Sequence, residues 1–246
     1  PLYRWDDHQQ TGFAWWTERI RATLRTVDII RLDHFRGFAA YWEVPYGHPT
    51  AEHGKWTPGP GAAFFEALQN ALGDLPIIAE DLGDITPEVI ELRKQAGLPG
   101  IKVLQFAFDG KADNPYLPFN VLPDSVFYTG THDNNTTLGW YQELDNDTRT
   151  RVHEYLGCGE NELLDRFLRE VWASTSALCI VPFQDILGLG ADARMNIPGT
   201  GGGNWQWRFT PDMVHEGRLA YLEHLTRVHG RMPVEPNPEM AQSGEE

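Results

Sequence analysis

The pattern that most restricts the fold of this chain is the alternation of short apolar segments with helical segments. Apolar runs predict buried strands over residues 27–33, 75–80, 102–108, 125–129 and 177–181. Helical spacing of apolar residues predicts helices over 15–26, 62–72 and 87–96, the last with Thr86 as its N-cap and Pro87 at its first position. Such alternation is typical of βαβ units, so we expect an α/β fold with a parallel sheet.

Polar residues at the strand ends favour a barrel over a doubly wound sheet. Asp33, Glu80, Asp133 and Asp185 each fall at or just beyond the end of a different predicted strand, which is where a (β/α)8 barrel carries its catalytic groups. The chain has no G-x-G-x-x-G or Walker sequence, the phosphate-binding motifs of nucleotide-binding sheets. We therefore expect a (β/α)8 barrel.

The length of the chain conflicts with a complete barrel. A whole barrel takes about 250 residues, and this chain has 246, but its loops are long and only five strands are predicted. The chain also begins with Pro1 instead of methionine. We expect the first barrel strands to lie upstream of Pro1, so that the barrel is incomplete here and an exposed sheet edge favours aggregation.

Composition excludes several classes of partner. The formal charge of -15 disfavours nucleic acid and anionic membranes, and no apolar run is long enough to span a bilayer. Cys158 and Cys179 form no disulfide framework, which predicts a cytoplasmic protein. Aromatic residues make up 12% of the chain, with nine tryptophans, and such rings serve either as core or as stacking surfaces for sugars.

Three carboxylates are the candidate catalytic groups. Arg31 and Asp33 share one face of a strand, so the arginine can keep the aspartate ionised, as a nucleophile requires. Glu80 directly follows apolar strand residues, and the partial desolvation expected there suits a general acid. Asp133 lies beside His132 after a third strand. Retaining glycoside chemistry uses one nucleophilic carboxylate and one carboxylic acid across the glycosidic bond.

Three motifs carry a specific resemblance. They are R-L-D-H-F-R-G over 31–37, I-I-A-E-D-L-G over 77–83 and T-H-D-N-N-T-T over 131–137, with agreeing stretches at 1–3, 12–13, 15–16, 181–185, 187–190, 193–196, 198–200 and 203–205. Together they resemble glycoside hydrolase family 77, the amylomaltases or plant disproportionating enzymes. The resemblance runs from Pro1 to about Arg227.

This resemblance implies a function and a role for each site residue. It implies a barrel of the α-amylase and glucanotransferase type over residues 1–230, containing about strands four to eight. The segment 231–246, rich in Pro, Glu and Ser, is expected from its composition to be a flexible polar tail. The resemblance also implies a 4-α-glucanotransferase that acts on α-1,4-glucans and maltooligosaccharides without a cofactor. The implied roles are nucleophile for Asp33, acid/base for Glu80, transition-state stabiliser for Asp133, and substrate contacts for Arg31, His34, His132, Asp109 and Asn196.

Three alternatives compete with glucan transfer. An α-amylase-type hydrolase would use the same carboxylates with water as the acceptor. A metal-dependent barrel hydrolase would use Asp33, His34, Glu80, His132 and Asp133 as ligands. A non-catalytic glucan-binding module is the third. Either Trp5 or Trp56 could stack on a sugar, although core packing explains each of them equally well.

Overall fold

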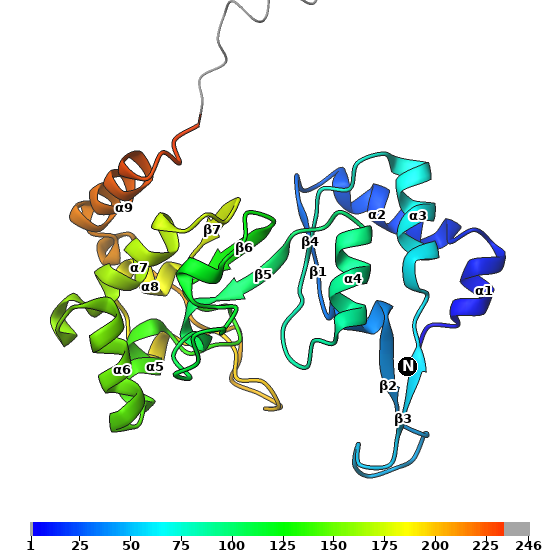
Figure 1. Ribbon diagram of the computed structural model, residues 1–246, viewed down its shortest axis with the longest axis horizontal. Coiled ribbons are helices and arrows are strands. Elements are labelled where there is room, and N and C mark those ends of the chain that lie inside the picture. The colour runs from blue at the N-terminus through cyan, green and yellow to red at the C-terminus, as the bar shows by residue number, and fades with distance from the viewer. Residues whose placement is uncertain (1, 234–246) are drawn as a thin grey trace, which may run out of the picture. The chain divides into compact units, whose positions relative to one another are not determined.

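The computed structural model describes residues 2–233 and alternates helices with strands (Figure 1). The first elements are α1 (Trp5–Gln10), α2 (Ala14–Leu24), β1 (Ile30–Leu32), η1 (Phe35–Phe38), β2 (Ala40–Glu43), β3 (Lys55–Pro58), α3 (Gly61–Leu72) and β4 (Ile77–Ala79). The central elements are α4 (Pro87–Gln95), β5 (Gly100–Val103), η2 (Leu104–Phe106), η3 (Pro118–Asn120), β6 (Ser125–Tyr128), α5 (Thr137–Glu143) and α6 (Asn146–Leu156). The last are η4 (Glu160–Glu162), α7 (Leu163–Ala173), β7 (Leu178–Ile180), α8 (Phe183–Leu187), η5 (Ala191–Ala193), η6 (Pro211–Met213) and α9 (Glu216–Val228).

Five strands form one sheet in the order β1–β4–β5–β6–β7. Strand β1 pairs with β4 in parallel, with Ile30 opposite Ile77 and Leu32 opposite Ala79, and β4 pairs in parallel with β5. This topology confirms the predicted α/β class with a parallel, five-stranded part of a barrel. Among the described residues β1 ends the sheet, and the aggregation expected at its outer edge stays a prediction.

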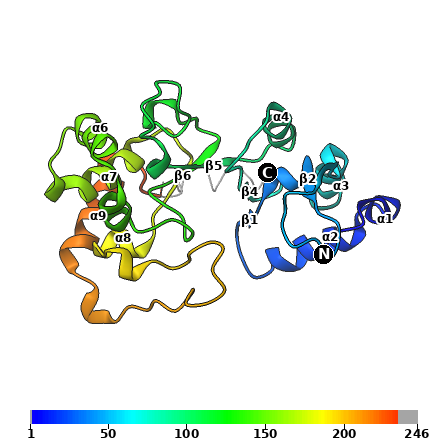
Figure 2. The same ribbon diagram turned by 90° about the horizontal axis from the view of Figure 1, so that it is seen from below.

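The chain divides into two compact units, each with its own hydrophobic core. Among the described residues, the first unit comprises 2–102, 122–126 and 176–178, and the second comprises 103–121, 127–175 and 179–233. Phe35, Phe64 and Phe65 are fully buried in the first core. In the second unit, helix α7 buries an apolar stripe, and both views place it beside α6 and α9 (Figures 1 and 2).

The hairpin of β2 and β3 is the main element that sequence reasoning missed, since no strand was predicted between residues 33 and 75. The two strands pair with Trp42 opposite Trp56, and their rings meet edge to face at 5.4 Å. A side chain at Gly54 would overlap the Trp42 ring, so the glycine permits the hairpin to close. The strand signal is weak because both strands are exposed or half-buried and neither is an apolar run.

The strand predicted over 102–108 begins earlier in the structure and is shorter than expected. The observed strand β5 begins at Gly100, and a short 3-10 helix starts at Leu104. A side chain at Gly100 would overlap the carboxylate of Asp81, which accepts a hydrogen bond of 2.8 Å from the backbone N–H of Ile101. The glycine that sequence reasoning left outside the strand is therefore the residue that lets the strand pass a buried carboxylate.

Asp81 belongs to a buried ionic cluster in the first unit. Its Oδ2 lies 3.2 Å from Nε of Arg93, and Arg93 also donates to the carbonyl oxygen of Leu98 and contacts Asp124. Burial raises the pKa of Asp81, against the opposing effects of Lys102, the Ile101 N–H and Arg93, and burial lowers the pKa of Lys102. The cluster ties β4, α4 and β5 together through groups that are costly to leave unpaired.

The end of the described chain is fixed to helix α7 and the residue after it by hydrogen bonds of Arg231. Arg231 donates to the carbonyl oxygens of Trp172 and Ser174 at 2.8 and 2.7 Å. Residues 234–246, most of the segment expected to be a flexible tail, lie outside the described residues. Over residues 2–233, no helix has both the length and the apolar character that crossing a bilayer requires.

The close approach at Gly100 generates a stability prediction. Gly100→Ala should lower the free energy of unfolding by about 1–3 kcal/mol, because the added methyl group must displace the Asp81 carboxylate from its partners. Gly159→Ala is the matched control, since it adds a methyl group in open space at an ordinary φ of -83°. Urea denaturation of both variants measures the difference, and equal stabilities would contradict this account of β5.

Candidate active site

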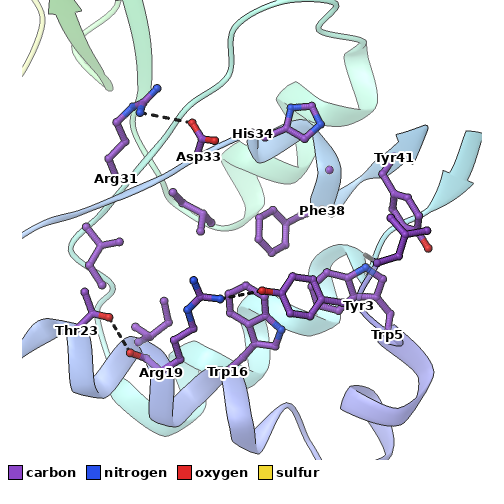
Figure 3. Close-up of a pocket in the computed structure, with 15 residues that line it drawn as sticks. Tyr3, Trp5, Trp16, Arg19, Thr23, Arg31, Asp33, His34, Phe38 and Tyr41 are labelled. Carbon is purple, nitrogen blue, oxygen red and sulfur yellow. Dashed lines mark hydrogen bonds and ion pairs between the residues drawn. The ribbon is translucent and has the colours of Figure 1, made fainter. Parts of the chain in front are cut away.

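The end of β1 presents an arginine and an aspartate on the same face, as the sequence predicts. Nη1 of Arg31 lies 3.5 Å from Oδ1 of Asp33 (Figure 3). The Asp33 side chain is 79% exposed while that of Arg31 is largely covered. The carboxylate therefore has a fixed positive neighbour and remains open to a ligand.

The residue after Asp33 makes a turn that few side chains accept. His34 has φ 49° and ψ 53°, the left-handed conformation that is uncommon outside glycine and in which Asn, Asp and His are the most frequent side chains. This turn directs the His34 backbone N–H to Oε2 of Glu80 at 2.7 Å, and the next N–H, of Phe35, to the Glu80 carbonyl oxygen at 2.9 Å. The loop after β1 thereby holds the carboxylate of Glu80, which follows the neighbouring strand β4.

Glu80 is fixed from both sides. Its Oε1 accepts the backbone N–H of Leu82 at 3.1 Å, and its own N–H donates to the carbonyl oxygen of Leu32 at 2.9 Å. Because β1 and β4 are neighbouring parallel strands, Asp33 and Glu80 emerge from the same edge of the sheet. The first unit thus brings together Arg31, Asp33, His34 and Glu80, four of the predicted site residues.

Arg36 supports this pair, although sequence reasoning gave it no role. It forms an ion pair with Oδ2 of Asp84 at 2.8 Å and also donates to the Asp84 carbonyl oxygen, on the loop that follows Glu80. Its guanidinium lies over the ring of Trp56 at 4.0 Å from the centroid. Arg36 thus links the turn at His34, the loop after β4 and the hairpin. The sequence signal that could have identified Arg36 is its position in the motif over 31–37, which also contains Asp33.

A pocket of about 440 Å³ opens beside Asp33 in the first unit. In Figure 3 it is bounded by the side chains of Tyr3, Trp5, Trp16, Arg19 and Tyr41, with Arg31, Asp33 and His34 at one side. Arg19 donates to the Tyr3 hydroxyl at 2.9 Å. Aromatic walls with a few charged groups suit a sugar, whose ring has both apolar faces and hydroxyl edges.

Trp5 and Trp56, the two tryptophans considered as stacking residues for a sugar, both make contacts within the protein. Trp5 stacks on Trp16 with an interplanar angle of 18° and also lines the pocket, so it can serve both purposes. Trp56 has Arg36 over its ring, which covers one of the two faces that a sugar would use. The geometry therefore favours Trp5 over Trp56 as a stacking residue.

Asp133 lies in the second unit, on the loop that follows β6. Its Oδ1 accepts a hydrogen bond of 2.6 Å from the side-chain amide of Asn196, and Nε2 of His132 lies 3.4 Å from the same oxygen. Arg194 donates to the Asp133 carbonyl oxygen at 2.7 Å. Asn196, expected to contact substrate, therefore holds the Asp133 carboxylate, and Arg194 is a neighbour that sequence reasoning missed.

His132 is also held by the loop after β7. Its carbonyl oxygen accepts the N–H of Asn196 at 3.1 Å, and its ring lies 5.2 Å from that of Trp205. Trp205 has a positive φ of 63° and is 53% exposed, an unusual combination for a large side chain. The second unit thus gathers His132, Asp133 and Asn196 and adds an exposed indole beside them.

Asp109 is engaged within its own loop after β5. Its Oδ1 accepts the N–H of Lys111 at 3.0 Å, and hydrogen bonding to Asn114 is the largest cause that lowers its pKa. Lys111 is also within 4.0 Å of the carboxylate. Asp109 therefore has a local structural role, and its predicted contact with substrate stays a prediction.

A metal site has no support in the grouping of side chains. Across residues 2–233, no cluster of three or more His, Cys, Asp and Glu residues is arranged to hold an ion. The residues that the metal-dependent alternative names are instead engaged in other contacts, with Glu80 on backbone N–H groups and Asp133 on Asn196.

Comparison with known proteins agrees with the motifs. Residues 1–214 match the family model of glycoside hydrolase 77, described as 4-alpha-glucanotransferase. The chain is 53% identical over 234 residues to the 4-alpha-glucanotransferase of Synechocystis, covering 94% of this chain and 46% of the relative. It is 47% identical over 236 residues to the chloroplastic/amyloplastic 4-alpha-glucanotransferase of Arabidopsis thaliana, covering 94% of this chain and 41% of that relative.

Solved structures show the same fold. The amylomaltase from Streptococcus agalactiae in complex with acarbose superposes with a TM-score of 0.92 at 38% identity, covering 95% of this chain and 48% of that one. The amylomaltase from Corynebacterium glutamicum shares the fold with a TM-score of 0.69 at 20% identity. The chain spans about half the length of the curated relatives it matches. On this match, the chain belongs to glycoside hydrolase family 77, the 4-alpha-glucanotransferases.

Proposed function

We propose that this chain carries the catalytic carboxylates of a retaining 4-α-glucanotransferase that acts on α-1,4-glucans and maltooligosaccharides. The observation that carries the proposal is the coupling of Asp33 and Glu80 through the His34 turn, on neighbouring strand ends beside an aromatic pocket. Membership of the family supports the activity, and the acarbose bound by the Streptococcus agalactiae amylomaltase supports an α-glucan ligand.

In the first step, an oxygen of Asp33 attacks the anomeric carbon and forms a covalent glucosyl-enzyme. The bond from that carbon to the glycosidic oxygen breaks, and protonated Glu80 gives its proton to the leaving oxygen. Arg31 places a positive charge 3.5 Å from the carboxylate that attacks. Oε2 of Glu80 accepts the His34 N–H in the described state, so the side chain must rotate or exchange this bond when it donates its proton.

In the second step, Glu80 accepts the proton of an acceptor 4-hydroxyl group, and that oxygen attacks the anomeric carbon. The Asp33 carboxylate leaves, and the second inversion restores the α-configuration. Transfer exceeds hydrolysis when the acceptor sugar is bound and oriented better than water is. The aromatic walls of the pocket beside Asp33 are suited to bind sugar in this way. Membership of the family favours the transferase over an α-amylase-type hydrolase.

We assign Asp133 the role of stabilising the oxocarbenium-like transition state. Its bond from Asn196 leaves the second carboxylate oxygen available, and the nearby His132 and Trp205 supply a hydrogen-bonding ring and a stacking face. Arg31 and His34 are the proposed substrate contacts of the first unit. The absence of a required cofactor and a cytoplasmic location are part of the same proposal, the latter supported by the free thiols of Cys158 and Cys179.

The products formed from maltotriose test the reaction class. The purified chain should convert maltotriose into both shorter and longer oligosaccharides, because glucosyl units pass to another sugar, and EDTA should not alter the rate. Chromatography of the products measures this. Shorter sugars alone would favour the hydrolase, loss of activity with EDTA would favour the metal enzyme, and binding without turnover would favour the glucan-binding module.

The nucleophile assignment has a direct substitution test. Asp33→Asn should lower the rate of transfer by about 10³-fold or more, because the neutral amide cannot form the covalent intermediate. Its unfolding midpoint should stay close to that of the parent chain, since the Asp33 side chain is largely exposed. Retention of substantial turnover by a folded Asp33→Asn chain would rule out this role.

The backbone of His34 can be tested apart from its side chain. His34→Gly and His34→Ala both remove the imidazole, but only glycine accepts the left-handed turn without strain, so the alanine variant should be less stable by about 1–2 kcal/mol. It should also transfer glucosyl units about tenfold more slowly, because the N–H that holds Glu80 is displaced. Urea denaturation and initial rates measure the difference. An alanine variant equal to glycine in both would contradict the role of the turn.

A further inference from the structure

Asp185 is a buried acid that the proposed reaction does not use. It lies in the short helix α8, and only 1% of its surface is exposed. Burial raises its pKa, while hydrogen bonds from two threonines oppose that effect. Burying a carboxylate is costly unless hydrogen bonds compensate for the lost water, so the donors around Asp185 decide whether it is stable there.

The Asp185 carboxylate accepts three hydrogen bonds from two residues. Oδ1 accepts the backbone N–H of Thr137 at 2.7 Å. Oδ2 accepts the hydroxyl groups of Thr129 at 2.6 Å and of Thr137 at 2.7 Å. The distances are those of charge-assisted bonds, and all three donors would lose their acceptor together if the carboxylate were removed.

The two threonines flank the loop that carries Asp133. Thr129 directly follows β6, Thr137 is the first residue of α5, and the loop between them covers 130–136. One carboxylate therefore binds the beginning and the end of this loop. Inside the loop, Oδ1 of Asn134 accepts from Thr131, so the short segment is braced from within as well.

The residue next to Asp185 fixes the other loop that reaches Asp133. The side-chain amide of Gln184, also buried, donates to the carbonyl oxygen of Ala193 at 3.1 Å. Ala193 precedes Arg194, which donates to the Asp133 carbonyl oxygen, and Asn196 lies two residues further and donates to the Asp133 carboxylate. Helix α8 thus supports both segments that meet at Asp133.

We propose that Asp185 is a positioning residue, which clamps the two ends of the 130–136 loop and so keeps the Asp133 carboxylate against Asn196. Its catalytic consequence rests on the proposed role of Asp133, but the clamp itself does not. An apolar residue of similar size would fill the same space without the burial cost of a carboxylate, yet it would offer no acceptor to the three donors.

Asparagine should preserve much of this clamp. In Asp185→Asn, the amide oxygen can still accept the Thr137 N–H, and the NH₂ group can donate to the two threonine hydroxyls, which rotate to accept. Asp185→Ala removes all three bonds. Thr129→Val is a gentler variant, since it deletes one hydroxyl at constant shape and releases one end of the loop.

The test measures hydrogen exchange of the backbone amides over 130–137 and the NMR signals of the Asn196 side-chain amide in the full 246-residue chain. In Asp185→Ala, the loop amides should exchange about tenfold to a hundredfold faster, and the Asn196 signals should move toward those of a free amide. Thr129→Val should give a smaller effect of the same kind, and Asp185→Asn should stay close to the parent chain. Asp81→Ala, which removes a buried carboxylate from the first unit, is the matched control and should leave these signals unchanged.

Each outcome decides between the clamp and its alternatives. Unchanged exchange over 130–137 in both Asp185→Ala and Thr129→Val would overturn the proposal. An equal change in Asp81→Ala would show general destabilisation instead of a local clamp, and would overturn it as well. If Asp185→Ala does not fold, Thr129→Val alone decides. Loop release without any fall in the transfer rate of an active chain would remove the catalytic role of Asp133 while leaving the clamp intact.

Discussion

The left-handed turn at His34 is the constraint on which the chemistry of the first unit depends. It reverses the chain directly after Asp33 and aims two successive N–H groups at Glu80, one at its carboxylate and one at its carbonyl oxygen. Hydrogen bonds between the two neighbouring strands alone would place their ends side by side, but they would leave a long Glu side chain free to rotate. The hydrogen bond from the His34 N–H, together with that from the Leu82 N–H, orders that side chain.

Buried polar contacts serve a similar purpose elsewhere in both units. Asp81 fixes the chain after Glu80 by binding Arg93 and the Ile101 N–H, and Asp185 fixes the loop of Asp133. Each buried carboxylate satisfies several donors from different segments, which is the circumstance in which burial of a charge is tolerated. The exposed carboxylates that we propose act on a ligand are thus accompanied by buried carboxylates that bind backbone and side-chain donors.

Sequence reasoning succeeded where the signal is local. The alternation of strands and helices, the placement of Asp33 and Glu80 at strand ends and the Arg31–Asp33 pair all follow from periodicity along one segment. The hairpin at Trp42 and Trp56 was missed because its strands are exposed or half-buried and neither is an apolar run. The start of β5 at Gly100 depends on a carboxylate nineteen residues away. The engagement of Asn196 by Asp133 spans sixty-three residues, and no pattern within one segment encodes such contacts.

The identity of the nucleophile is the central claim, and trapping the covalent intermediate tests it most directly. In Glu80→Gln, α-glucosyl fluoride can still glucosylate the enzyme, because fluoride leaves without protonation, but the following transfer lacks its base. Peptide mass spectrometry of this variant should find a hexose attached to Asp33. A hexose on another residue, or a product with inverted anomeric configuration and no adduct, would contradict the account.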